Sequence, residues 1–320
     1  MEKVSLIATK LSLYLDFCTL QNGTAQHSQR QTNQSEQIFM SVIAKIAQWG
    51  VIIYAAVALL IWWLHPLVLF RPTTLAASYA YSFNIPFEEI TFEPEKGQVR
   101  LNALWFGTRD SVVLKRATFI SGKVVLFFHG NRDNLARWGR EYAERFTKRG
   151  YNVLMYDYRG YGKSTGTRSE DALHHDAQYV YDFLKQRFSE DSIIVYGYSI
   201  GSGMASRIAA NNRPKRLILE APYASIPTLG RTQLPIFPYE WLTRYKFRTD
   251  SCFAHIHCPI HLFHGTDDIT VPYQNSLILL SSPSPVKAQL TTLPKGHHLH
   301  LDSFPMYRST LDSLLKIDNQ

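Results

Sequence analysis

The hydrophobic positions of this chain follow two patterns. Residues 51–64 form one uninterrupted apolar run. Beyond about residue 85, short runs of β-branched and aromatic residues alternate with segments in which apolar residues recur every three or four positions. Short apolar runs predict buried strands, and the three-to-four spacing predicts helices. Their alternation predicts a mostly parallel sheet that is covered by helices on both faces.

This alternation gives a predicted sheet of eight strands. Strands at 88–92 and 99–106 are expected to open the sheet as an antiparallel pair. The later strands are expected at 124–128, 152–156, 193–196, 217–219, 260–263 and 288–293. Helices are expected at about 134–148, 171–188, 200–211, 273–281 and 304–316.

The apolar run near the N-terminus predicts a membrane anchor. It contains no charged residue, and its apolar character continues to Phe70, which makes it long enough to cross the hydrocarbon core of a bilayer. Tryptophans stand near both ends of the run, as interfacial aromatic residues do (Trp49, Trp62 and Trp63). We therefore expect a transmembrane anchor at 40–71 and a folded domain at 72–320.

Residues 1–39 differ in composition from the rest of the chain. Residues 21–37 are rich in Gln, Asn, Ser and Thr, which is typical of disorder. We expect 1–39 to be disordered or a non-native extension, with Met40 as an alternative start. The basic residues before the run outnumber those that follow it closely, so the N-terminus is expected in the cytoplasm and the folded domain outside it. A start at Met40 would remove most of this difference.

Net charge and cysteine content exclude few classes of binding partner. The net charge is +8, but Lys and Arg are scattered and no nucleic-acid-binding motif is present, so we expect a basic surface facing anionic lipid and no nucleic-acid partner. The chain has three cysteines. Cys252 and Cys258 could pair in an exported domain or remain free, buried thiols.

The segment 197–201 reads G-Y-S-I-G and carries the strongest sign of chemistry. A predicted strand precedes it and a predicted helix follows it. A sharp turn between the two would present the Ser199 hydroxyl at the carboxyl edge of the sheet. A serine hydroxyl is a weak nucleophile, so it needs a histidine base, a carboxylate that orients this base, and donors for the oxyanion.

Candidates for the other groups follow in the required order. Asp268 stands after the strand at 260–263 with the spacing H-G-x-x-D-x-x-V-P, whereas the adjacent Asp267 suits a turn or a helix cap. Behind the last strand, His298 is the preferred base and His297 the alternative. The expected oxyanion donors are the backbone N–H groups of Ile200 and Asn131. Asn131 is the last residue of an H-G-N segment that follows an apolar strand.

These motifs together resemble one protein family. The segment D-Y-R-G-Y-G at 157–162 joins H-G-N at 129–131, G-Y-S-I-G and the H-G-x-x-D-x-x-V-P segment in their expected order. The set resembles membrane-anchored serine hydrolases among the α/β-hydrolases, similar to lysophospholipases, carboxylesterases and depalmitoylases. The resemblance covers about residues 85–320. It implies the α/β-hydrolase fold and a Ser199–Asp268–His298 triad that needs no metal or organic cofactor.

The resemblance also implies a substrate class, an ester or thioester of an acylated, lipid-like molecule. Residues 223–257 interrupt the strand–helix rhythm with aromatic, proline and basic residues at a place where such enzymes insert a cap. Two interpretations of this segment stay open: a short aromatic lid that forms an acyl-chain pocket and includes Trp241 and Phe247, or a loop with one helix packed on the domain. Two alternatives stay open, a serine peptidase of the same fold and a non-catalytic, membrane-tethered binding protein.

Overall fold

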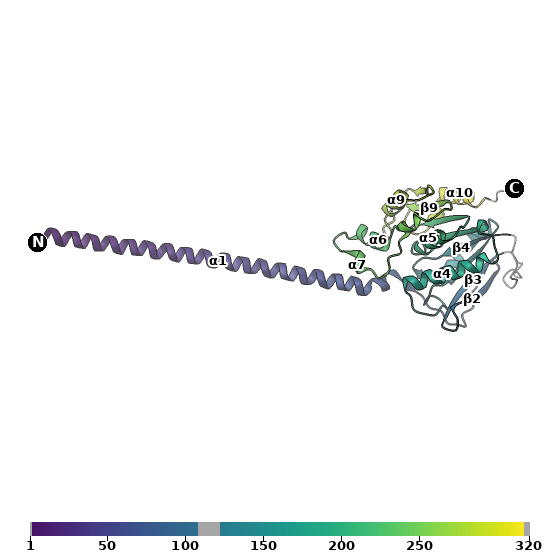
Figure 1. The fold of residues 1–320 in the computed structure, drawn as a ribbon, viewed down its shortest axis with the longest axis horizontal. Helices are drawn as coiled ribbons and strands as arrows, with labels where there is room; N and C mark the ends of the chain where they lie inside the picture. The colour runs from purple at the N-terminus through teal and green to yellow at the C-terminus, as the bar shows by residue number, and fades with distance from the viewer. Residues whose placement is uncertain (1, 108–121, 317–320) are drawn as a thin grey trace. The chain divides into compact units, whose positions relative to one another are not determined.

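The computed structural model describes residues 2–107 and 122–316 and divides into two compact units, 1–60 and 61–320, each of which is treated by itself. Helix α1 (Glu2–Leu69) supplies the whole first unit and continues into the second (Figure 1). Its part Asn33–Leu69 is long and apolar enough to cross a membrane, and the most apolar stretch is not buried against other protein.

Helix α1 also includes the polar segment that the composition predicts to be disordered. Residues 21–37 contain one glycine and no proline, so nothing in their backbone chemistry interrupts the helical hydrogen bonds. The N-terminal extension at 1–39 and the anchor at 40–71 remain predictions.

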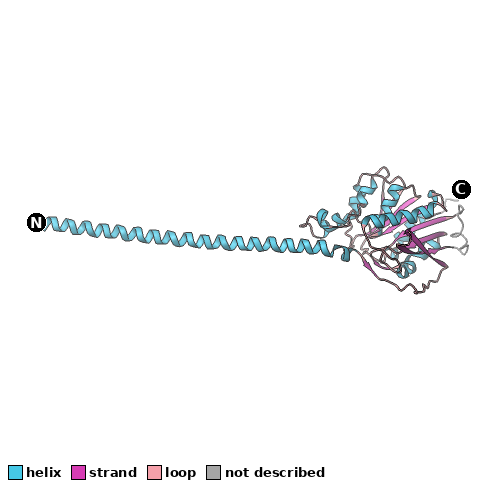
Figure 2. Ribbon diagram, turned by 60° about the horizontal axis from the view of Figure 1, so that its bottom comes forward, coloured by secondary structure: helices cyan, strands magenta, loops and turns pink. Residues whose placement is uncertain are grey.

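The second unit is built on a sheet, whose strands are magenta in Figure 2. The sheet has eight strands in the order β10-β9-β8-β7-β4-β6-β3-β2. Among the strand pairs of the described residues, only β2–β3 and β3–β6 are antiparallel, and this mostly parallel sheet confirms the predicted fold. The strands are β2 (Phe87–Glu95), β3 (Val99–Phe106), β4 (Lys123–Phe128), β6 (Tyr151–Tyr156), β7 (Ile193–Tyr198), β8 (Arg216–Glu220), β9 (Ile260–Gly265) and β10 (Gln289–Leu293). A separate parallel pair joins β1 (Arg71–Pro72) to β5 (Arg132–Asp133).

Helices cover both faces of the sheet. On one face lie α4 (Glu170–Lys185), α5 (Gly201–Asn211) and α9 (Gln274–Ser281). On the other lie α2 (Leu135–Trp138), the π-helix η2 (Gly139–Ala143), α3 (Glu144–Thr147) and α10 (Pro305–Leu314), which follows the 3-10 turn η4 (Leu301–Ser303). The predicted helices at 134–148 and 304–316 are therefore present with slightly different ends.

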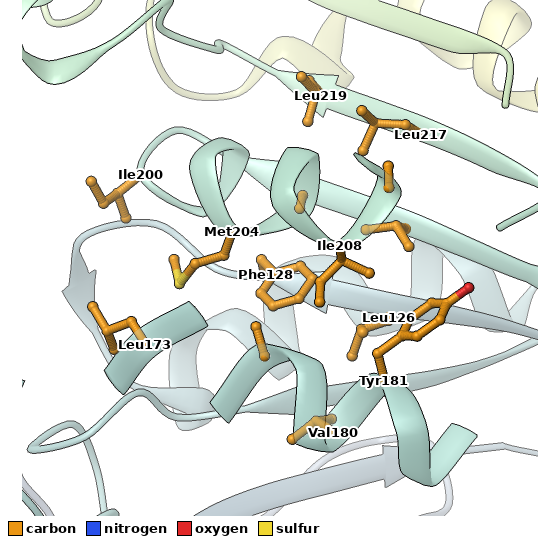
Figure 3. Packing of buried hydrophobic residues seen from close by; sticks show 14 of the residues in the cluster. Leu126, Phe128, Leu173, Val180, Tyr181, Ile200, Met204, Ile208, Leu217 and Leu219 are labelled. Atoms are coloured by element: carbon orange, nitrogen blue, oxygen red, sulfur yellow. The ribbon is translucent and has the colours of Figure 1, made fainter. Parts of the chain in front are cut away.

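Strand residues alternate between the two cores that these helices close. Leu126 and Phe128 on β4 face the core that contains Met204 and Ile208 of α5 (Figure 3). Val125 and Phe127 belong to the core on the opposite face. Because each fully buried apolar side chain contributes about 1.5–3 kcal/mol, this two-sided burial holds the central strands and the turns at their carboxyl ends in fixed positions.

The segment 223–257 lies between β8 and β9 and contains three short helices, α6 (Ile226–Gln233), α7 (Tyr239–Leu242) and α8 (Thr249–Phe253). It does not form one uniform aromatic layer. Phe247 is fully buried in the core, whereas the Trp241 side chain is exposed to solvent.

Candidate active site

The turn between β7 and α5 holds Ser199 in a left-handed conformation with φ of 50°. This region is unfavourable for a residue with a Cβ, so surrounding contacts must enforce it. A Cβ on Gly201 would lie 2.3 Å from the backbone oxygen of Phe128, and one on Gly197 would lie 2.7 Å from Cβ of Ala205. The Ser199 amide donates to the Glu220 carbonyl at 2.9 Å. The two glycines therefore allow the tight turn that the motif predicts.

Ser199, His298 and Asp268 meet at the carboxyl edge of the sheet. His298 Nε2 lies 3.0 Å from Ser199 Oγ, and His298 Nδ1 lies 2.7 Å from Asp268 Oδ2. An ionised carboxylate only accepts, so Nδ1 carries the hydrogen and Nε2 of the neutral ring accepts from the serine hydroxyl. This is the geometry that general-base activation of a serine requires.

The Asp268 carboxylate is buried yet held in its ionised form. The amides of Thr270 and Val271 both donate to Oδ1 at 2.9 Å. Burial alone would raise the pKa of Asp268, but hydrogen bonds from His264 and His298 and the Val271 amide hold this pKa well below its ordinary value. The carboxylate can therefore orient His298 and stabilise its charged form.

The two alternative residues occupy other positions. His297 is exposed, and its Nδ1 lies 3.0 Å from the backbone oxygen of Asp267. The Asp267 side chain is also exposed and accepts from the Thr266 hydroxyl. Of the two histidines that the sequence left open, the structure brings His298 and not His297 to Ser199.

The expected oxyanion donors stand on the two loops that flank Ser199. Ile200 is the residue from which α5 starts, and Asn131 follows β4. The Asn131 peptide is fixed through its oxygen, which accepts from the Arg71 amide and the Tyr161 hydroxyl at 2.8 Å each. Within the described parts of the chain, neither the Ile200 nor the Asn131 amide donates to a protein acceptor, so both can serve a bound oxyanion.

His129, the histidine of the H-G-N segment, is buried beneath the loop that carries Asn131 and contacts its neighbours. His129 is fully buried, stacks on Tyr158 at 4.0 Å between ring centres, and places Nε2 3.4 Å from Asp157 Oδ1. Burial raises the pKa of Asp157, while His129 and the Leu135 amide lower it in part. These groups hold the loop that carries Asn131 and do not reach the serine hydroxyl.

Two residues near the triad carry contacts that sequence reasoning missed. The Tyr198 hydroxyl donates to the His298 backbone oxygen at 2.8 Å and so ties the serine turn to the histidine loop. His264 is fully buried and places Nε2 3.3 Å from Asp268 Oδ2. The available signal was the spacing itself, because His264 begins the same H-G-x-x-D segment that identified Asp268.

The donor set offers little to a metal ion. Among residues 2–107 and 122–316, no group of three or more His, Cys, Asp or Glu side chains is arranged to hold one.

Parts of this chain are similar in sequence to proteins with assigned names. A family model described as serine aminopeptidase, S33, matches residues 121–244. The lysophosphatidylserine lipase ABHD12 of Macaca fascicularis is 29% identical over 214 residues, which cover 58% of this chain and 52% of that protein. The α/β-hydrolase domain-containing protein WAV2 of Arabidopsis thaliana is 28% identical over 278 residues, covering 80% of this chain and 87% of that one.

Among solved structures, the Pyrococcus furiosus esterase Pf2001 superposes with a TM-score of 0.57 at 21% identity, covering 77% of this chain and 98% of the esterase. At this identity the likeness shows the fold. The chain spans about half the length of the curated lipases that it matches.

Proposed function

This chain is an α/β-hydrolase, and from that premise we propose that it is a membrane-anchored serine hydrolase that cleaves carboxylic ester or thioester bonds of acylated, lipid-like substrates. One observation carries the proposal, the continuous contact from Ser199 through His298 to Asp268. A folded chain with no hydrolytic role would have no need for a strained serine whose hydroxyl faces an oriented imidazole.

In the proposed reaction, Ser199 Oγ attacks the acyl carbonyl while His298 Nε2 takes its proton. The carbonyl oxygen becomes an oxyanion, which the amides of Ile200 and Asn131 bind. His298 then gives the proton to the leaving alcohol or thiol, and Asp268 stabilises the imidazolium throughout. Water, activated by the same imidazole, releases the acyl group from Ser199 as a carboxylic acid.

The acylated substrate class rests on two supports. Matched relatives are named lysophosphatidylserine lipases, and the solved structures of similar fold include an esterase. A segment long enough to cross a membrane stands directly before the catalytic unit. We propose that it anchors the enzyme to membrane lipid, with the N-terminus in the cytoplasm and the catalytic domain outside it.

We assign no acyl pocket to Trp241 and Phe247, the aromatic pair that the sequence suggested. Phe247 packs in the core against Phe70 and Tyr245, whereas Trp241 is 82% exposed. The two side chains therefore do not share one pocket, because the chain turns at Phe247, whose φ is 36°, and directs it inward. Residues 223–257 remain a proposed lid without this role for the pair.

A fluorophosphonate probe tests the proposal on the full chain in detergent micelles. We expect wild type to be labelled and Ser199→Ala to lose labelling by a factor of about 10³ or more. Ser206→Ala is the matched control, since Ser206 is also buried on the adjacent helix but does not contact the triad. Unlabelled, folded wild type would contradict the proposal and favour a binding protein.

The family model described as a serine aminopeptidase makes a peptidase the second candidate. Parallel assays with p-nitrophenyl esters of increasing acyl length and with aminoacyl naphthylamides separate the two. The proposal requires faster turnover of the esters; faster release from the naphthylamides would replace it with the peptidase.

A further inference from the structure

Large apolar side chains are exposed on the connection between α6 and α7, on α7 and on the loop after Asp268. We call this group the apolar tip: Leu234, Ile236, Trp241 and Ile269. Their exposed fractions are 45%, 61%, 82% and 85%. Single exposed apolar residues are common on soluble proteins, but a local group of this size marks an interaction surface.

The tip is a built feature of the fold. Phe237 on the connection and Tyr239 at the start of α7 are buried, and a Cβ on Gly230 would lie 2.5 Å from the Tyr239 ring. The Thr243 hydroxyl donates to the Tyr239 backbone oxygen at 2.9 Å. The inner side of the connection is thus packed, and this packing holds Ile236 and Trp241 on its outer side.

The end of the proposed anchor contacts the same segment. Within the catalytic unit, the Arg244 guanidinium lies over the Trp62 ring at 4.1 Å, and Tyr245 packs edge-on against Phe70 at 4.8 Å. Tryptophans near the end of a span lie at the membrane–water interface. Trp241 is three residues from Arg244, so its Cα is within about 11 Å of that of a residue at this level.

The surroundings of the tip favour lipid over a protein partner. Arg231 and Arg248 both pair with the carboxylate of Glu240. Residues 231–248 contain two further basic residues, Arg244 and Lys246, and no other acidic one, so basic side chains exceed acidic ones in this segment. A tryptophan with apolar neighbours and a basic rim is typical of surfaces that enter the interfacial layer of a bilayer.

The tip also connects to the active site. The Gln233 side-chain amide donates to the backbone oxygens of Ile269 and Thr270 at 3.0 and 3.3 Å. These residues follow Asp268 directly. A surface that touches lipid through Ile269 therefore belongs to the loop that carries the triad carboxylate.

We propose that the apolar tip is a second membrane contact, which enters the interfacial layer of the bilayer that α1 crosses and holds the Ser199–His298–Asp268 site next to acylated lipids. This inference rests on the proposed membrane anchor and extends the proposed function to the delivery of substrate. Arg231 and Arg244 are its contacts with anionic headgroups.

Tryptophan quenching tests the contact without reference to activity. The full chain is reconstituted into vesicles of phosphatidylcholine and phosphatidylserine, with or without lipids brominated in the acyl chain. The six tryptophans include Trp241, so the difference between wild type and Trp241→Phe isolates its signal. We expect brominated lipid to remove about half or more of this difference signal.

Ser199→Ala should show the same quenching, which separates this test from that of catalysis. If the anchor tryptophans are quenched and the Trp241 signal is not, the membrane contact of the tip is wrong and the anchor is unaffected. If the tryptophans near the ends of the anchor are not quenched either, the chain is not in the bilayer, and the contact and the anchor fall together while serine labelling can still succeed.

A second measurement asks whether the contact matters for substrate. Two activities are compared, that on a long-chain ester in vesicles and that on a soluble short-chain ester. In the double variant Ile236→Asp, Trp241→Asp, the ratio of the first activity to the second should fall about tenfold, because charged side chains resist insertion into the bilayer. Met306→Asp, a charge placed at an exposed apolar position on α10, is the matched control and should leave the ratio unchanged. Equal ratios in both variants would overturn the proposed delivery.

Discussion

His264 Nε2 lies 3.3 Å from Asp268 Oδ2, so the carboxylate that orients the proposed base has a second, fully buried imidazole beside it. The same nitrogen lies 2.8 Å from the Val271 backbone oxygen. Both neighbours of Nε2 are acceptors, so Nε2 carries the hydrogen. Nδ1 lies 2.6 Å from Ser276 Oγ and accepts from this hydroxyl in the neutral ring.

This arrangement predicts that His264 positions Asp268. His264→Phe keeps a ring but leaves the Val271 oxygen and the Ser276 hydroxyl without their buried partner, so we expect a loss of about 1–3 kcal/mol in the free energy of unfolding. The rate of fluorophosphonate labelling per folded molecule should fall about tenfold, because the carboxylate loses one of the groups that orient it. Ser276→Ala retains the Nε2 contacts and should affect labelling less. A labelling rate in His264→Phe equal to that of wild type would restrict His264 to stability.

The turn at Ser199 gives a second prediction. In Gly201→Ala the new methyl group would meet the backbone oxygen of Phe128, which cannot move aside without displacing β4. We expect a loss of about 3 kcal/mol or more in the free energy of unfolding, together with loss of serine labelling. Gly50→Ala is the control, because nothing lies within 4 Å of a Cβ there and alanine favours the helix. Thermal unfolding in the same detergent compares the two, and similar values would contradict the steric argument.

The motifs of this chain predict its fold well because each one sits at a strand end. Buried β-branched and aromatic runs locate the strands, and the G-Y-S-I-G segment locates the strained turn after β7. Asp268 could be selected from spacing, since the loop from Gly265 to Asp268 is short and its conformation is dictated by the close approach of Gly265 to Gly296.

Other features depend on conformations that sequence patterns do not specify. Whether His297 or His298 reaches the serine depends on the path of the loop at Lys295, which adopts a left-handed φ of 60° although it is not glycine. The opposite burial of Trp241 and Phe247 depends on the left-handed turn at Phe247. Periodicity carries no information on such single-residue turns, which tertiary packing enforces.

The two described cysteines give a third prediction. Cys252 and Cys258 are free and buried, and burial raises the pKa of each thiol to about 11. Since the ordinary value is 9.0, the thiolate fraction near pH 8 is lower by a factor of about 100. Cys18, the third cysteine of the sequence, is removed by Cys18→Ser. In this variant we expect no reaction with Ellman's reagent in the native state, and two reacting thiols after unfolding without reductant. A thiol that reacts in the native state would show that it is not buried. Fewer than two reacting thiols after unfolding would show that Cys252 and Cys258 are not both free.

The last prediction concerns Glu220, a fully buried carboxyl at the end of β8 whose backbone oxygen accepts from the Ser199 amide. Three tyrosine hydroxyls donate to its side chain, those of Tyr142, Tyr196 and Tyr307. Burial raises the pKa of Glu220, and Arg145 and the tyrosines offset this only in part.

A raised pKa means that the folded state keeps the Glu220 proton at a pH where the unfolded chain has lost it. The folded state then binds more protons from about pH 4.5, the ordinary value, up to its own higher pKa, so the free energy of unfolding falls as pH rises through this window. Glu220→Gln cannot ionise and lacks this dependence. The stability of wild type minus that of Glu220→Gln, measured by urea unfolding at a series of pH values, should therefore decrease with pH by about 1.4 kcal/mol for each unit by which the pKa is raised. All other titratable groups are common to both proteins and cancel to first order, so a difference that stays flat or rises with pH would show that the buried carboxyl is not harder to ionise than an exposed one.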